Sequence, residues 1–471
     1  MAKTLEITHV YPSTDSSNSL SDFSLPLTFC DTLWFKAYPV ERLFFYSLPQ
    51  PKQTFLNSTI PKLKNSLSQT LQHFLPLAGN LTWPIDSSKP IILYTPNDGV
   101  SLTVAESNAA NKDEDFDFLS GKQARKPASF HPLVPKLKVS ETGASVISLQ
   151  ITLFPNRGIC IGVTCHHAVL DGKSTTMFMK SWAYFCRSEK QDLSPELTPF
   201  YDRSVIMDPD GLDMLYLNHW LALSKMSDPR DDPNLFQFFP TSELSSNLVR
   251  GTFELTKSDI VKLRQKVLST WEKLEPTIRA TKPHLSSFVV TFAYALVCIL
   301  KVDIEEDEET NKKKTVFGFT ADLRSRLKPP VPENYFGNCV GALASFEDAR
   351  ELLKEEDAFA AAAVKTGELI KELEEKDVME GAREILARMV SGLLEGARAV
   401  GVAGSPRFGV YGTDFGWGKP KKVEIVSVDR TGAIAMAESR DGNGGIEIGV
   451  VLNKHEMDVF SSLFLSGVKS A

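Results

Sequence analysis

Apolar residues recur at helical spacing early in the chain. Leu63, Leu67 and Leu71 follow one another at every fourth position, which places their side chains on one side of an α-helix. Pro61 suits the first turn of a helix, and the polar residues 57–59 are candidate N-caps. The pattern predicts an amphipathic helix that begins just before Pro61.

Alternating residues follow further along the chain. Residues 146–153 carry Ile or Leu at every second position, which is the pattern of a half-buried strand. The segment 155–158, Pro-Asn-Arg-Gly, is typical of a tight turn, and residues 159–165 form a second, more apolar run. These segments predict a β-hairpin that leads directly into His166 and His167.

The second half of the chain also mixes helical and strand patterns. Residues 288–300 form an apolar run that predicts a buried helix, and the Ala-, Glu- and Leu-rich segment 348–400 predicts further helices. Strand patterns return at 422–428, 432–438 and 446–452. Mixed elements in both halves predict an α/β or α+β fold with two layered domains.

Two polar segments separate these patterns. Residues 227–242 begin with Ser-Asp-Pro-Arg-Asp-Asp-Pro-Asn and are typical of an exposed linker, so we expect domains at 1–226 and 243–471. The acidic and then basic run at 303–314 predicts a solvated loop. The length of 471 residues is sufficient for two or three domains.

Composition narrows the class of protein. Hydrophobic residues make up 42% and charged residues 24% of the chain, as in globular proteins, and the net charge of −7 argues against a nucleic-acid surface. The six cysteines lack metal-ligand spacing, and no apolar run is long enough for a membrane span or a secretory signal. We therefore expect a cytoplasmic protein with buried, free cysteines, no metal site, and no nucleic-acid or membrane partner.

Short motifs of several other enzyme classes are incomplete. Gly172-Lys-Ser lacks the earlier glycine of a phosphate-binding loop, because His167 occupies that position. Asp414-Phe-Gly resembles the magnesium motif of protein kinases, but the sequence has no His-Arg-Asp segment. A nucleophile elbow and a complete dinucleotide-binding motif are also missing from the sequence. These observations weaken the kinase, NTPase, serine hydrolase and dehydrogenase hypotheses.

His167 and Asp171 form the strongest candidate for catalysis. Among the eight histidines, His167 is the one followed by Asp at the fourth position. The pair lies where a predicted strand gives way to a turn and then to a helix with Phe178, Trp182 and Phe185 on one face. A histidine on such a rigid mount can accept a proton near neutral pH. From spacing alone, a structural histidine bonded to a turn carbonyl is an equally good interpretation.

Four further motifs accompany the His-x-x-x-Asp motif. They are Leu75-Pro-Leu-Ala-Gly79, Asp322-Leu-Arg-Ser-Arg326, Tyr335-Phe-Gly-Asn-Cys339 and Asp414-Phe-Gly-Trp-Gly418. The ordered set covers nearly the whole chain and resembles the plant BAHD acyltransferase family. The sequence is most similar to the phenolic and flavonoid (isoflavone, anthocyanin) glucoside malonyltransferases of that family.

The resemblance implies a fold and a set of roles. The fold is that of CoA-dependent acyltransferases such as chloramphenicol acetyltransferase, with two α/β domains and a channel between them. His167 is implied to be the general base in this channel, acting without an acyl-enzyme. Asp171 is implied to be structural and to pair with Arg324. Asp414 and Trp417 are implied to support the site, Trp417 by packing or by donating to the oxyanion.

The resemblance also implies how CoA binds. Lys257, Ser286 and Ser287 match family positions that contact CoA, although Lys257 fits an ordinary solvated lysine equally well. Malonyl-CoA is the implied co-substrate, and no tightly bound cofactor is expected. Some relatives hold the malonyl carboxylate with an arginine shortly after the His-x-x-x-Asp motif. Here that neighbourhood contains Lys173, so Lys173 or a residue elsewhere must supply the cation, and a Lys173 directed to solvent is the simpler interpretation.

The resemblance therefore predicts a monomeric acyltransferase with two small-molecule partners, an acyl-CoA and a phenolic glucoside. It transfers a malonyl group to a sugar hydroxyl, the 6-hydroxyl, of a phenolic or flavonoid glucoside. Two alternatives stay open at this point. The first is transfer of a coumaroyl or caffeoyl group, which requires an apolar slot where a malonyl group requires a cation. The second is a non-catalytic protein that binds the small molecule and needs no general base. The sequence leaves the natural acceptor undefined.

Overall fold

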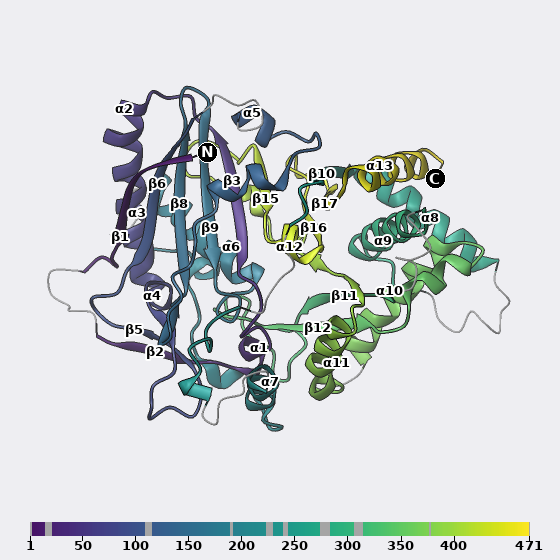
Figure 1. The fold of residues 1–471 in the computed structure, drawn as a ribbon, viewed down its shortest axis with the longest axis horizontal. Helices are drawn as coiled ribbons and strands as arrows, with labels where there is room; N and C mark the ends of the chain where they lie inside the picture. The colour runs from purple at the N-terminus through teal and green to yellow at the C-terminus, as the bar shows by residue number, and fades with distance from the viewer. Residues whose placement is uncertain are drawn as a thin grey trace.

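The chain forms two halves that lie side by side (Figure 1). The computed structural model describes residues 2–14, 21–108, 115–188, 192–222, 229–238, 244–273, 283–305, 314–375 and 378–470. The strands of these residues form four sheets, and helices pack against them. The mixed α/β architecture predicted from the sequence is confirmed. No helix in these ranges is both long and apolar enough to cross a membrane.

The large sheet of the N-terminal half carries the predicted hairpin. Its strands, from one edge to the other, are β1 (Ala2–Val10), β6 (Val100–Ser107), β8 (Ile147–Phe154), β9 (Gly158–Cys165), β3 (Val40–Ser47) and β15 (Lys422–Ile425). Strands β6 and β8 run parallel, and the other neighbours are antiparallel. A smaller antiparallel sheet contains β2 (Phe23–Pro26), β5 (Ile91–Tyr94), β4 (Asn80–Thr82) and β7 (Gly143–Ser145).

Helices and loops cover both faces of the large sheet. The helices of this half are α1 (Phe29–Thr32), α2 (Lys52–Thr54), α3 (Ile60–His73), α4 (Leu75–Ala78), α5 (Phe116–Leu119), α6 (Gly172–Arg187) and α7 (Leu212–Leu221). Leucines of α3 and aromatic residues of α6 belong to the main core, whereas Phe116 and Phe130 pack with Phe45 in a second, smaller cluster. Strand β8 is therefore buried on both faces and not half-buried as predicted.

The C-terminal half is built around a buried helix. Its sheets contain β10 (Leu248–Leu255), β17 (Ile446–Asn453), β16 (Ile434–Glu438) and β14 (Val402–Ala403), and β12 (Val340–Ser345), β11 (Thr315–Asp322) and β13 (Arg398–Val400). Its helices are α8 (Lys257–Glu272), α9 (Ser287–Glu305), α10 (Ala358–Glu375), α11 (Ala382–Leu394), α12 (Val428–Thr431) and α13 (Lys454–Lys469). Residues 289–300 of α9 are buried, as their apolar run predicts.

Strand β15 joins the two halves. It belongs to the C-terminal half in sequence but pairs with β3 in the N-terminal sheet, with Lys422 opposite Phe45 and Ile425 opposite Arg42. Figure 1 shows this late strand beside the early strand β3. The sheet hydrogen bonds therefore cross from one half to the other.

Three sequence predictions differ from the structure or lie partly outside the described residues. The N-cap expected at residues 57–59 is wrong, because the helix begins at Lys52 and passes through a π-helical turn, Phe55–Thr59, before α3. Buried Phe55 anchors this earlier start. Residues 306–313 of the predicted charged loop lie outside the described residues, as do parts of the linker 227–242. The linker and the domain limits stay predictions.

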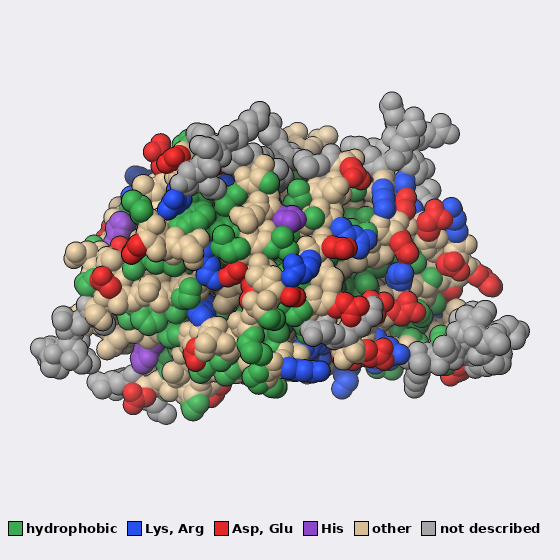
Figure 2. Space-filling view, turned by 90° about the horizontal axis from the view of Figure 1, so that it is seen from below, with side chains coloured by type: hydrophobic (Ala, Val, Ile, Leu, Met, Phe, Trp, Pro, Cys, Tyr) green, Lys and Arg blue, Asp and Glu red, His purple; other side chains and the backbone are tan. Residues whose placement is uncertain are grey.

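The surface carries charges of both signs. Figure 2 shows lysine and arginine side chains interspersed with acidic ones on the face seen there. All six cysteines are buried and free, which confirms the expectation for their side chains. The described residues contain no group of three or more His, Cys, Asp or Glu arranged to hold a metal ion.

Candidate active site

His167 lies at the junction between the hairpin and α6. Strand β9 ends at Cys165, and the His166 backbone N–H donates to the Val146 carbonyl at 2.9 Å, which fixes the turn. The half-buried His167 ring stacks on the indole of Trp34, with ring centroids 4.5 Å apart and planes 14° apart. This stacking fixes the plane of the imidazole, as a reacting group requires.

The two adjacent histidines have different environments. His166 is fully buried, its Nδ1 accepts the Ala168 backbone N–H at 3.2 Å, and burial lowers its pKa to about 3. Burial also lowers the pKa of His167, whereas its own backbone and the Asp171 carboxylate partly oppose this shift. The His167 imidazole is therefore neutral at neutral pH and can accept a proton.

Asp171 has a structural position. Its side chain caps α6 by accepting the Ser174 backbone N–H at 2.8 Å. Its other oxygen lies 2.8 Å from Nη2 of Arg324 and accepts the Cys339 backbone N–H at 3.2 Å. The ion pair implied by the resemblance is present, and it leaves the buried carboxylate with little capacity to contact a substrate.

Arg324 connects the two halves beside the site. Its guanidinium pairs with Asp171 of the N-terminal half and with Asp322 of its own half, at 2.8 and 3.0 Å. It also donates to the Tyr335 carbonyl at 3.1 Å. The two carboxylates raise the pKa of Arg324 against the opposing effect of burial. Arg324 thus stays charged and fixes the start of α6.

Sequence reasoning missed a second polar network at the site. Asn338 Nδ2 donates to the His167 carbonyl at 2.9 Å and to Asp31 Oδ1 at 3.1 Å. Asp31 is fully buried and also caps α1. The buried atoms His167 Nδ1, Trp34 Nε1 and Asn338 Oδ1 have no hydrogen-bond partner. Unpaired buried polar atoms are unusual in folded proteins, and here three of them lie on residues that stack on or bond to the base or belong to it.

The Asp414–Gly418 motif forms a separate turn. Asp414 Oδ1 accepts the backbone N–H groups of Gly416 and Gly418, both at 2.8 Å, and both glycines have positive φ angles. Phe415 packs edge-on against Trp182 of α6. The motif therefore stabilises its own turn and attaches it to the N-terminal half.

Trp417 lies far from His167 along the sheet. It packs edge-on against Tyr46, which lies opposite Ile159 in the sheet, whereas His167 follows Cys165. From Ile159 to Cys165 the strand advances about 20 Å, at about 3.3 Å per residue. This separation favours the packing role of Trp417 over donation from its indole to an oxyanion, and both roles stay predictions.

The residues expected to contact CoA lie at two helix starts. Exposed Lys257 is the first residue of α8. Ser286 Oγ accepts the Val289 backbone N–H at 3.3 Å at the start of α9, and Ser287 Oγ accepts from Arg264 Nη2 at 3.2 Å. Helix starts carry positive potential, which suits phosphate groups. CoA binding at these residues stays a prediction.

Lys173 is already neutralised. Its ammonium group pairs with Asp322 at 3.3 Å and also with Glu333. Two carboxylates therefore compete with any malonyl carboxylate at this lysine. This geometry fits a lysine that forms ion pairs at the protein surface better than one that contacts the substrate.

A cavity of about 380 Å³ is lined by residues from both halves of the described structure. Its wall includes Leu33, the neighbour of Trp34, and Val340, two residues after Asn338. Its remaining lining is largely apolar and comes from β12, α10 and α11, with Arg388 stacked 4.0 Å above the Phe346 ring centroid. A cavity with many apolar side chains suits an aromatic substrate.

The fold and this site define a two-part acyltransferase with a histidine at the junction of its halves. Solved vinorine synthase has the same fold, with a TM-score of 0.69 at 22% identity, over 99% of this chain and 98% of that one.

The Transferase family matches residues 3–465, and the chain belongs to this family. It is 44% identical to phenolic glucoside malonyltransferase 1 of Arabidopsis thaliana, over 99% of this chain and 98% of the relative. It is 42% identical, with the same coverage, to malonyl-CoA:anthocyanidin 5-O-glucoside-6''-O-malonyltransferase of the same organism. The resemblance to BAHD acyltransferases is thereby confirmed.

Proposed function

We propose that this protein transfers a malonyl group from malonyl-CoA to a sugar hydroxyl, the 6-hydroxyl, of a phenolic or flavonoid glucoside. The observation that carries the proposal is the full-length similarity, at 44% and 42% identity, to two enzymes named for this type of reaction. The neutral His167, stacked on Trp34, supports it. A cytoplasmic monomer is our prediction for location and assembly.

His167 acts as the general base in the proposed reaction. Its Nδ1 is buried, so Nε2 is the nitrogen that accepts the proton of the sugar hydroxyl. The oxygen attacks the thioester carbonyl and forms a tetrahedral oxyanion. This intermediate collapses, the carbon–sulfur bond breaks, and CoA thiolate leaves. The thiolate is a good leaving group because thiols have a pKa of about 8.5. The proton on His167 then passes to the thiolate.

Both substrates bind together, so no acyl-enzyme is needed. Holding the hydroxyl against the thioester converts a bimolecular step into an effectively unimolecular one. The stack with Trp34 and the Asn338 bond to the His167 carbonyl hold the base in place for this encounter. The cavity lined by β12, α10 and α11 receives the aromatic aglycone of the acceptor.

A competition assay tests the donor and the acceptor class. The protein is incubated with a flavonoid glucoside and equal concentrations of malonyl-CoA and coumaroyl-CoA, and the products are separated and identified by mass and NMR. We expect the 6-O-malonyl glucoside to predominate. A predominance of coumaroyl product would establish the hydroxycinnamoyl alternative. Binding of the glucoside without transfer from either donor would indicate a non-catalytic binding protein.

A further inference from the structure

Arg42 is a buried cation without a counter-ion. It lies on β3, and the residue is 2% exposed to solvent. Among the described residues, no carboxylate oxygen lies within the 4.0 Å ion-pair distance of its guanidinium. Its Nη1 donates a hydrogen bond to Thr176 Oγ1 at 3.1 Å, and its Cζ lies 5.8 Å from the centroid of the Phe408 ring. Its Nε is buried and has no hydrogen-bond partner, a property that it shares with the Nε atoms of several ion-paired arginines.

This arrangement is costly for a structural residue. A buried charge is normally paired, because leaving water without compensation destabilises the folded protein. The other large buried arginines illustrate the rule: Arg125 and Arg250 both pair with Glu424, and Arg324 pairs with Asp171. Arg42 is therefore a cation whose partner the described part of the protein does not supply.

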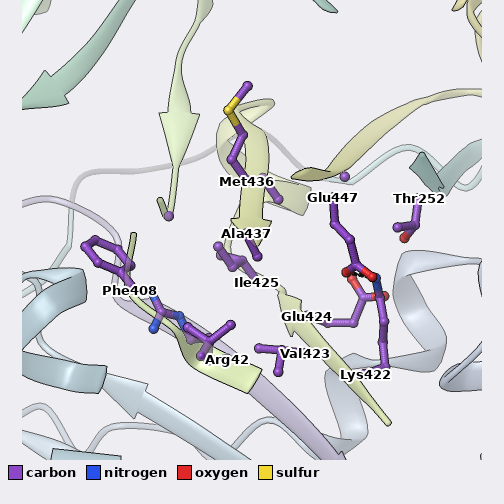
Figure 3. Close-up of a pocket in the computed structure, with 14 residues that line it drawn as sticks. Arg42, Thr252, Phe408, Lys422, Val423, Glu424, Ile425, Met436, Ala437 and Glu447 are labelled. Atoms are coloured by element: carbon purple, nitrogen blue, oxygen red, sulfur yellow. Dashed lines mark hydrogen bonds and ion pairs between the residues drawn. The ribbon is translucent and has the colours of Figure 1, made fainter. Parts of the chain in front are cut away.

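Arg42 lines a narrow cavity between the two halves (Figure 3). The cavity measures about 30 Å³ and is also lined by Phe408, Ile425 and Met436. Figure 3 shows the Arg42 guanidinium beside the Phe408 ring, on the side away from the Lys422 and Glu447 side chains. A space of this size suits a small polar group and excludes an aromatic ring.

The acidic residues near this cavity have other partners. Glu424 pairs with Arg125 at 2.9 Å and with Arg250 at 3.0 Å, and Glu447 pairs with Lys422 at 2.7 Å. They therefore leave the charge of Arg42 uncompensated.

A third carboxylate, Glu438, accepts the Tyr411 backbone N–H at 2.9 Å and acts on both Arg42 and Lys180 from beyond ion-pair distance. Asp171 also acts on Arg42 from beyond ion-pair distance. Two carboxylates therefore influence Arg42 at longer range, and neither of them is paired with it.

The helix that follows the His167–Asp171 motif contacts this cation. A Cβ atom on Gly172 would lie 3.2 Å from Arg42 Nη2, so the guanidinium rests against the first turn of α6. Thr176, its hydrogen-bond partner, is one turn later on the same helix. This first turn follows the His167–Asp171 motif without interruption. The positive end of the α6 dipole adds to the attraction for an anion.

We propose that Arg42 binds the carboxylate of the malonyl group and so selects malonyl-CoA as the donor. The inference rests on the proposed function. One methylene group separates the malonyl carboxylate from the thioester carbonyl, so its cation must lie close to the base. A guanidinium without an ion-pair partner is a suitable donor for a carboxylate, which needs such a partner when it leaves water.

The test compares two donors in matched variants. Initial rates are measured for wild type, Arg42→Met, Arg42→Lys, Lys173→Met and Arg157→Met, with malonyl-CoA or acetyl-CoA and one phenolic glucoside. Loss of a charged hydrogen bond predicts that Arg42→Met lowers the malonyl-to-acetyl ratio of kcat/KM about 10- to 100-fold. Arg42→Lys recovers part of the ratio. Arg157 is exposed and distant in the fold, so Arg157→Met leaves the ratio unchanged.

Three outcomes would overturn the inference. An unchanged ratio in Arg42→Met excludes a contact with the malonyl carboxylate. Equal losses with both donors indicate that Arg42 serves folding or CoA binding. A selective loss in Lys173→Met, with none in Arg42→Met, assigns the contact to Lys173. If Arg42→Met does not fold, as shown by circular dichroism, an unchanged ratio in Arg42→Lys overturns the inference instead.

The experiment separates this inference from the proposed function. If wild type transfers no malonyl group, the proposed function fails, whatever Arg42 does. If wild type transfers malonyl and the Arg42 variants keep its selectivity, the proposed function stands and the assignment of Arg42 fails.

Discussion

The His167–Asp171 motif and the Asp414–Gly418 motif both characterise the family in sequence, yet they use their carboxylates differently. Asp171 reaches across to Arg324 and Cys339 of the other half, next to the base. Asp414 bonds back to its own turn, at the opposite end of the β3–β9 pair. A motif can therefore identify a family either through its chemistry or through a turn that holds the chain together.

Among the variants of the two motifs, His167→Ala should cause the largest loss of turnover. Removal of a general base typically lowers kcat by about 10²- to 10⁴-fold. Because the ring is only half-buried, we expect the melting temperature to change little. His9→Ala, on exposed β1, is the matched control and should keep wild-type turnover. Retention of more than about a tenth of kcat, with chemistry rate-limiting, would exclude His167 as the base.

The pH dependence of wild type sharpens the role of His167. The neutral imidazole is the active form, and burial holds the pKa of His167 below its ordinary value of 6.5. As the pH falls from neutral, kcat/KM should therefore stay level past 6.5 and decrease only when the pH passes the lowered pKa. An acidic limb centred above 6.5 would assign the base to another group.

Asp171→Asn should affect stability and activity together. The change leaves the buried Arg324 without its partner across the two halves, and a broken buried pair typically costs about 3–5 kcal/mol. We expect a lower melting temperature by calorimetry and a lower kcat, because the start of α6 loses its anchor. Complete inactivation at unchanged stability would instead give Asp171 a direct part in the chemistry.

Asp414→Ala should be milder. It removes two hydrogen bonds that close the turn, and the loss of a comparable capping side chain costs about 1 kcal/mol. The melting temperature should fall by a few degrees, as is typical for about 1 kcal/mol. The kcat of the folded protein should stay near the wild-type value. A decrease of kcat by more than about tenfold, or about 1.4 kcal/mol in barrier, would place Asp414 at the reaction.

The smallest effect is expected for Lys257→Ala. An exposed lysine that contacts a CoA phosphate contributes a screened interaction, so the KM for malonyl-CoA should rise and its dependence on salt should weaken. Lys262→Ala, on the same helix, is the control and should leave both quantities unchanged. A change confined to the KM for the glucoside would remove Lys257 from the CoA site.

The sequence predicted those parts of the fold that local periodicity determines. The hairpin 146–165, helix α6 and buried helix α9 each combine a strong apolar period with clear boundaries, and each is present. The start of the first long helix was missed, because a π-helical turn has no simple sequence pattern. The burial of both faces of β8 depends on residues near Phe116 and Phe130, which sequence pattern alone does not place.

The candidate site was predictable only in part. The family motifs contain His167, Asp171 and Arg324, so these residues could be found from the sequence. The ion pair between Asp171 and Arg324 is present in the structure. Asp31 and Asn338 gave weaker signals: a lone acid in an apolar segment and a motif residue without an assigned role. Their contact joins positions that are 307 residues apart, so it exists only when the halves pack.

The pairing of β15 with β3 also determines when the N-terminal sheet can be completed during synthesis of the chain. Strands β1, β6, β8, β9 and β3 are synthesised by residue 165, but the strand that covers β3 lies at 422–425. During translation, β3 therefore presents an open edge while more than half of the chain is still to come. Such edges are templates for pairing between chains. A fragment ending at residue 226 would keep this edge permanently exposed, so the first half would be prone to aggregate when produced without the second.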